Sequence, residues 1–95
     1  MKVKEILEGL IHNFDEFLYA NAIVNEGVKI VYATQPQRVE VGYVIYGAVS
    51  LLDEVYGFEV SYNKYANEVE IRSQIFWFKK SLGEIKKFLK EKQSK

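Results

Sequence analysis

The sequence contains no cysteine, one histidine and one proline in 95 residues. Without cysteine the chain has no disulfide, no zinc–thiolate centre and no thiol nucleophile. With one proline and six glycines it has few breaks between ordered segments, so we expect most of it to fold. The longest apolar run, residues 43–52, is about half of the ~20 residues that a membrane-spanning helix requires.

The N-terminal segment, residues 1–18, alternates charged and apolar side chains at short intervals. It lacks the continuous apolar stretch and the small-residue cleavage site of a signal peptide, so we expect a cytoplasmic location and no membrane partner. Ninety-five residues, of which 48% are hydrophobic, suffice for one buried core. We therefore predict a single domain over residues 1–95.

The charged residues are mostly lysine and glutamate, with eleven of each against two arginines and two aspartates. This composition is common in hyperthermophiles and suggests a thermophilic source. The formal net charge is zero. Residues 75–95 nevertheless hold seven lysines and two glutamates, which makes the C-terminal end a local basic segment.

Residues 3–18 repeat apolar side chains every three or four positions, which predicts an amphipathic helix. Asn13 and Glu16 have the spacing of a capping box, so a break near Asn13 is expected. Gly27 marks the expected end of this helical region.

Period-two alternation in residues 28–33 predicts a strand, and two further alternating runs around the polar residues 64–67 predict a β-hairpin. The outer, solvated face of this sheet should carry Lys29, Glu59, Glu70 and Arg72. Its inner face should carry apolar side chains, namely Val28, Ile30, Tyr32, Phe58, Val60, Tyr62, Val69 and Ile71.

The segment between Pro36 and Gly57 fits two interpretations. As a helix it places seven apolar side chains on one stripe, with Pro36 in a tolerated first-turn position and Gly57 at its end. As a strand, residues 39–45 also alternate, and their β-branched side chains suit a sheet. Because residues 34–37 lack the glycine or asparagine that a tight hairpin normally needs, we predict the helix.

The last helix is predicted from Phe78 onward, where apolar residues again recur at helical spacing. The predicted fold is a two-layer α+β domain in the order α-β-α-β-β-α, with a small sheet covered by helices. If residues 37–46 form a strand, the order becomes α-ββ-α-ββ-α with four strands. Three helices are more than three short strands need as cover, so we also predict a homodimer.

No pattern in the sequence predicts a catalytic site. His12 has Glu8 and Glu16 four residues away on either side, a spacing compatible with a metal site, but this helical face should be solvated and there is no second histidine. The adjacent carboxylates Asp15 and Glu16 diverge by about 100° on a helix, so they do not face one pocket. We predict no metal or cofactor and favour a protein without enzymatic activity.

Two groups of residues suggest binding surfaces. Gly42 and Gly47 each cost about 1 kcal/mol within the predicted helix, and Tyr43 and Tyr46 lie on its exposed face. Large amphipathic side chains beside such glycines are typical of protein interfaces. The leading prediction is therefore a protein-interaction or regulatory module that binds a protein partner or itself through Tyr43 and Tyr46.

The alternative is nucleic-acid binding by a basic C-terminal helix. Lysine ammonium groups along one helical flank would contact phosphates. The lysines expected to do so are Lys79, Lys80, Lys86, Lys87 and Lys90.

Overall fold

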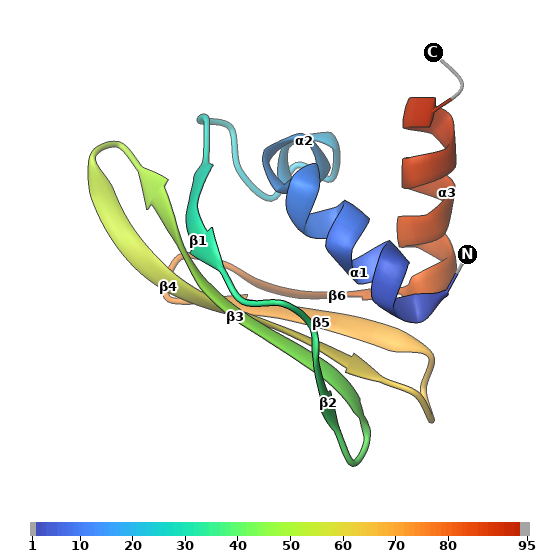
Figure 1. Cartoon of the computed structure of the whole chain (residues 1–95). Coiled ribbons are helices and arrows are strands. Elements are labelled where there is room, and N and C mark those ends of the chain that lie inside the picture. The colour runs from blue at the N-terminus through green and yellow to red at the C-terminus, as the bar shows by residue number, and fades with distance from the viewer. Residues whose placement is uncertain (1, 94–95) are drawn as a thin grey trace.

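In the computed structural model, which describes residues 2–93, two helices precede an antiparallel sheet and a third helix follows it (Figure 1). The helices are α1 (Val3–His12), α2 (Phe14–Ala20) and α3 (Leu82–Gln93). The strands are β1 (Lys29–Ala33), β2 (Gln37–Val39), β3 (Gly42–Leu51), β4 (Glu54–Asn63), β5 (Glu68–Ser73) and β6 (Trp77–Ser81).

The six strands form one sheet in the order β1-β3-β4-β5-β6, and every pair is antiparallel. The short strand β2 pairs with β3 on the same edge as β1, at the opposite end of β3. The three helices lie on one side of the sheet, which curves around them (Figure 1). We call the side that faces the helices the inner face and the other side the outer face.

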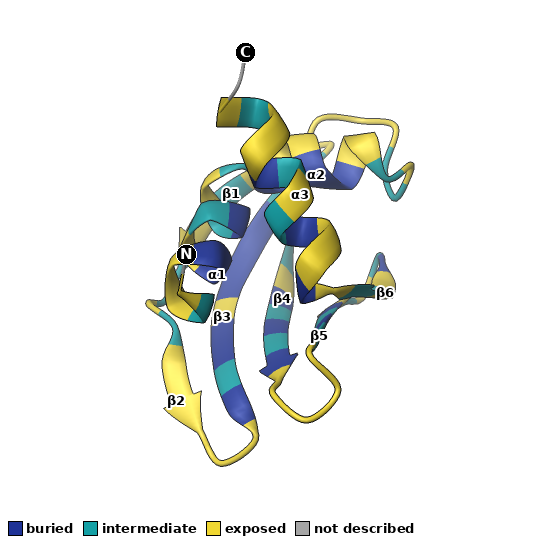
Figure 2. Cartoon of the chain, turned by 90° about the vertical axis from the view of Figure 1, so that its right-hand side faces the viewer, coloured by how far each residue is buried: buried dark blue, intermediate teal, exposed yellow. Residues whose placement is uncertain are grey.

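The core fills the space between the helices and the inner face. Aromatic contacts connect the layers: the Phe14 ring of α2 stacks on Phe58 of β4, and Phe17 packs edge-on against Phe88 of α3, each with 5.1 Å between ring centroids. Figure 2, viewed from the helix side, shows buried residues along the helices and the central strands. Fully buried members include Ile6, Leu7, Leu10, Leu18, Ile45, Val49, Val60, Ile71 and Ile85.

Several predictions from the sequence are confirmed. The fold is mixed α+β with helices against a sheet, residues 29–33 of the predicted 28–33 form a strand, and the hairpin around 64–67 is present. The first helical region does break at Asn13, whose side-chain amide donates a hydrogen bond to the Gly9 carbonyl oxygen at 2.8 Å. The predicted end at Gly27 is wrong, because α2 stops at Ala20.

The helix predicted for residues 36–57 is wrong, since this segment forms β2, β3 and the first part of β4. The strand alternative was closer, although the sheet has six strands instead of four. β3 has buried residues on both faces: Ile45 and Val49 face the core, while Val44 and Ala48 on the outer face are each only 7% exposed, although Tyr46 between them is exposed. A strand buried on both faces gives a nearly continuous apolar run that also fits a helical stripe.

Two further assignments are corrected. A β-bulge between Ile30 and Tyr32 shifts the register of β1, so Tyr32 lies on the outer face instead of in the core. The last helix begins at Leu82 and not at Phe78, because residues 77–81 form the edge strand β6.

Gly47 allows β1 and the Phe58 ring to pack closely against β3. A methyl group at this position would overlap the carbonyl oxygen of Tyr32 and lie 2.5 Å from Cζ of Phe58. The Phe58 ring therefore occupies the space that a side chain of residue 47 would need. Gly57 lies nearby on β4, and a methyl group there would meet only the Gly47 carbonyl oxygen, at 3.9 Å.

We predict that Gly47→Ala lowers the free energy of unfolding by about 1–3 kcal/mol, because Phe58 and the backbone of β1 must move to admit the methyl group. Gly57→Ala is the matched control and should change it by less than about 1 kcal/mol, since its methyl group fits without overlap. Urea denaturation of the two variants measures both values. Equal losses of unfolding free energy in the two variants would show that the close contact at Gly47 does not exclude a side chain at this position.

Candidate functional site

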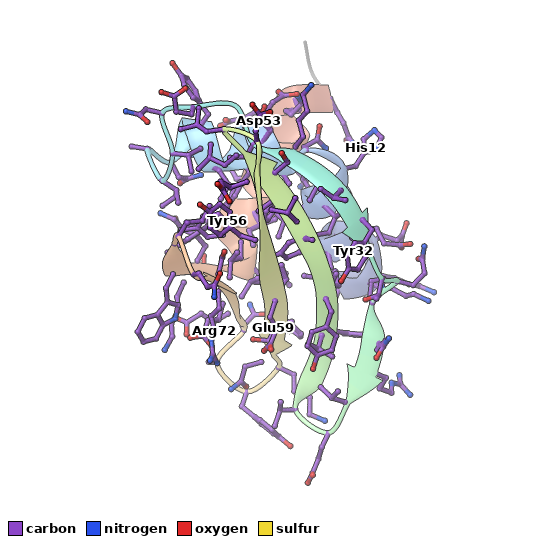
Figure 3. All side chains as sticks on the ribbon, turned by 90° about the vertical axis from the view of Figure 1, so that its left-hand side faces the viewer. His12, Tyr32, Asp53, Tyr56, Glu59 and Arg72 are labelled. Atoms are coloured by element: carbon purple, nitrogen blue, oxygen red, sulfur yellow. The ribbon has the colours of Figure 1, made fainter. Side chains whose placement is uncertain are left out.

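The outer face of the sheet has no helix over it in the described part of the chain. Figure 3 views this face directly and shows Tyr32, Glu59 and Arg72 on it. The strand register assigns it a mixture of aromatic, aliphatic and charged side chains. They include Lys29, Tyr32, Val44, Tyr46, Ala48, Val55, Glu59, Ser61, Glu68, Glu70, Arg72, Trp77 and Lys79.

Three aromatic side chains of the outer face are exposed. Trp77 on β6 is 71% exposed, Tyr32 on β1 is 58% exposed and Tyr46 on β3 is 47% exposed. Val55 on β4 is a further exposed apolar residue of this face. Single exposed apolar residues are ordinary, whereas several large ones on one sheet face indicate a contact surface.

A row of four side chains crosses the outer face perpendicular to the strands. Tyr46 pairs with Glu59, Glu59 with Arg72, and Arg72 with Trp77, one residue from each of four successive strands. Neighbouring positions in such a row are ~4.8 Å apart along the sheet. The order of side chains is therefore aromatic, acidic, basic, aromatic.

The charged groups of this row are available for contacts with another molecule. Within residues 2–93, the side chains of Glu59 and Arg72 form no hydrogen bond or ion pair, and neither does that of Lys79. Glu70 accepts a hydrogen bond from the indole Nε1 of Trp77 at 2.5 Å. The outer face holds three positive and three negative residues, so its charge is balanced.

A shallow depression of about 490 Å³ opens on the outer face beside Tyr32 and Tyr46. Glu59 and Arg72 border it on one side. Gly57 lies in its lining without a side chain to fill it. The depression is open and broad, which suits contact with a protruding side chain of another protein better than enclosure of a small molecule.

Tyr43 and Tyr46, predicted to share one exposed helical face, lie on opposite faces of β3. Residues three apart in a strand point to opposite sides, so Tyr46 is on the outer face and Tyr43 packs partly against the core beside Tyr62. Tyr43 also lines a separate depression of about 780 Å³ with Arg38 and Lys64. Of these two predicted residues, only Tyr46 lies on the same face as other exposed aromatic side chains.

The five lysines predicted to form one basic flank are divided between two elements. Lys79 lies on the outer face of β6, and Lys80, on its other side, has its Nζ 3.8 Å from a carboxylate oxygen of Glu84. The other three, Lys86, Lys87 and Lys90, line a shallow depression on α3. The basic surface on α3 is therefore smaller than expected.

The helical face of Glu8, His12 and Glu16 is interrupted, because α1 ends at His12 and Glu16 lies on α2. The Glu16 carboxylate accepts a hydrogen bond from Nζ of Lys92. The Asp15 carboxylate accepts one from the Val28 amide at 3.0 Å. Across residues 2–93 no three histidine, aspartate or glutamate residues are placed to hold a metal ion, and no polar or charged side chain is buried.

No protein-family model matches the chain, and no curated protein or solved structure matches it. None of the helices within residues 2–93 has the length and apolar character needed to cross a membrane. The outer face of the sheet is therefore the feature from which a function can be inferred.

We predict that the exposed aromatics of the outer face contribute little to stability. Tyr46→Thr and Trp77→Thr should each lower the free energy of unfolding by less than about 1 kcal/mol, because threonine keeps the preference for a strand and little buried area is lost. Tyr62→Thr, on the inner face of β4, should cost about 3 kcal/mol. Urea denaturation at low protein concentration measures the three values.

A loss at Tyr46 or Trp77 as large as that at Tyr62 would contradict this prediction. Such a result would mean that these side chains serve the stability of the fold. The exposed aromatic side chains would then no longer support a binding role for the outer face.

Proposed function

We propose that this chain is a protein-interaction or regulatory module without enzymatic activity, which binds a protein partner through the outer face of its sheet. The observation that supports this proposal is the group of exposed aromatic side chains, Tyr32, Tyr46 and Trp77, on a sheet face that none of the described helices covers. Tyrosine and tryptophan are enriched at protein interfaces and supply much of their binding energy.

The shape of the face favours a protein as the partner. A small molecule is usually held in a concave pocket that buries most of its surface, whereas the depression between Tyr46 and Arg72 is open and shallow. The flanking charged residues, Glu59 and Arg72, supply the polar component that a protein interface combines with its aromatic anchors. A second molecule with a broad surface can contact all of these groups at once.

The polar residues of the described chain also favour binding over catalysis. General acids, bases and nucleophiles need partly buried side chains held against one another. Within residues 2–93 no charged side chain is fully buried, and of the adjacent carboxylates Asp53 lies in the turn between β3 and β4 while Glu54 is the first residue of β4.

Site-specific photo-crosslinking tests the proposal. A photo-reactive phenylalanine analogue placed at position 46 should form covalent adducts with a protein partner in cells of the source organism, because Tyr46 lies within the proposed contact. The matched control carries the same analogue at Tyr65, which is 76% exposed in the turn between β4 and β5. Adducts are identified by mass spectrometry.

Adducts that form at position 46 and not at position 65 would support the outer face as the binding surface. The absence of adducts at position 46, or identical adducts at both positions, would refute it.

A second candidate function is binding to nucleic acid through α3. The observation that favours it is the grouping of Lys86, Lys87 and Lys90 around one depression. Three ammonium groups on one surface can neutralise phosphates and release counterions.

If α3 binds nucleic acid, the variant Lys86→Gln/Lys87→Gln/Lys90→Gln should bind labelled DNA or RNA more weakly, and the slope of log affinity against log salt should fall by about 2–3. Lys64→Gln, in the turn between β4 and β5, is the control and should leave both quantities nearly unchanged. Fluorescence anisotropy measures the affinities. No binding by the unmodified chain at low salt would eliminate this candidate.

A further inference from the structure

The outer face has a distribution of side chains that complements itself. We infer that the partner of this face is a second copy of the same chain, packed sheet to sheet about a two-fold axis that runs along the strands between β4 and β5. This inference rests on the proposed function, and it specifies the partner, the axis and the contacts.

The main evidence is the order of side chains in the row Tyr46, Glu59, Arg72 and Trp77. A two-fold axis between β4 and β5, parallel to the strands, exchanges the two halves of this row between the copies. Glu59 of one copy then faces Arg72 of the other, and Tyr46 faces Trp77. Each contact occurs twice in the dimer, as an isologous interface requires.

The neighbouring row is compatible with the same axis. It consists, in strand order, of Val44, Ser61, Glu70 and Lys79. The axis brings the Ser61 hydroxyl of one copy opposite the Glu70 carboxylate of the other, which is a donor facing an acceptor. It also brings Val44 opposite Lys79, whose aliphatic stem can cover an apolar side chain while its ammonium group stays in water.

The charge balance of the face favours self-association. Three positive and three negative residues lie on it, whereas a face of one sign would repel a copy of itself. Within residues 2–93 the Glu59 and Arg72 side chains have no ion-pair partner, so each is free to pair across the interface. Their positions near the centre of the row place these pairs next to the axis.

The geometry of the sheet also permits this packing. Two antiparallel sheets stack face to face about 10 Å apart, with their strands within about 30° of alignment. No helix covers the outer face of the described chain, and the helices of each copy would lie on the outside of the dimer. Aromatic rings such as Tyr46 and Trp77 are long enough to meet across such a gap.

The experiment uses the purified full chain and two charge-reversed variants, Glu59→Arg and Arg72→Glu. Analytical ultracentrifugation should show that the unmodified chain forms dimers. Each variant alone should dimerise at least about tenfold more weakly, because reversal places like charges opposite one another. An equimolar mixture of the two variants should dimerise about as strongly as the unmodified chain.

The mixture is the decisive sample. Residues 59 and 72 are also cross-strand neighbours within one chain, so each single reversal places like charges side by side within the chain as well as across the interface, and a double reversal in one chain would remove both effects together. In the mixture the like charges at positions 59 and 72 remain side by side within every chain. Only the intermolecular contacts become attractive, because the arginine introduced at position 59 of one variant faces the glutamate introduced at position 72 of the other.

Trp77, the single tryptophan of the chain, provides a second measurement. Its emission should shift to the blue as the protein concentration rises, because the dimer buries an indole that is 71% exposed in the single chain. Circular dichroism establishes that the variants are folded. If either reversal unfolds the chain, Glu59→Gln and Arg72→Gln replace them, and each should weaken dimerisation several-fold.

A purified chain that stays monomeric, variants that dimerise as tightly as the unmodified chain, or a mixture that does not recover would each overturn the inference. The crosslinking experiment distinguishes failure of the self-association inference from failure of the proposed function. Adducts from position 46 to a different protein, with a monomeric purified chain, would refute self-association and support the outer face as a binding surface. A monomeric chain without adducts would refute both.

Discussion

The position of the Phe58 ring is the constraint on which much of the structure depends. On one side the ring occupies the space above Gly47 of β3, and on the other it stacks on Phe14 of α2. This stack joins two strands and the helical layer through one side chain. Because it uses the inner face of the sheet, the helices are held there and the outer face is left without cover.

The two faces of the sheet consequently have different roles. The inner face carries Ile45, Val49 and Val60 at nearly zero exposure, and its side chains determine stability. On the outer face, exposed aromatic side chains accompany the buried Val44 and Ala48, and the side chains of Glu59, Arg72 and Lys79 form no hydrogen bond or ion pair within the described residues. Exposed aromatic rings beside charged groups that have no partner in the same chain are typical of protein interfaces, which supports the proposed binding of another protein.

The parts of the fold that follow a clear local period could be predicted from the sequence. Residues 3–18 repeat at the helical period and the hairpin around 64–67 alternates in steps of two, because each of these segments buries only one face. The segment 36–57 could not be assigned correctly, since β3 has buried apolar residues on both faces. The two turns of this segment also lack the usual sequence signal for a hairpin. Glu40–Val41 and Leu52–Asp53 contain no glycine, and Leu52 adopts φ 51° although leucine is not a usual turn residue.

The candidate site was less predictable than the fold. Tyr46 was identified, but through a helical face shared with Tyr43 that does not exist. Tyr32 was assigned to the core because a bulge that reverses a side chain has no reliable sequence signal. The row from Tyr46 to Trp77 is drawn from four separate strands, so it depends on strand register and cannot be read from neighbouring positions in the sequence.

The placement of the helices also determines how this protein can be joined to others. Both α1, near the N-terminal end, and α3, near the C-terminal end, lie on the side of the sheet opposite the outer face (Figure 1). A tag, fluorescent protein or surface linker attached beyond either helix would extend from the helical side. Immobilisation or display by either end would leave the proposed binding face on the side away from the attachment point.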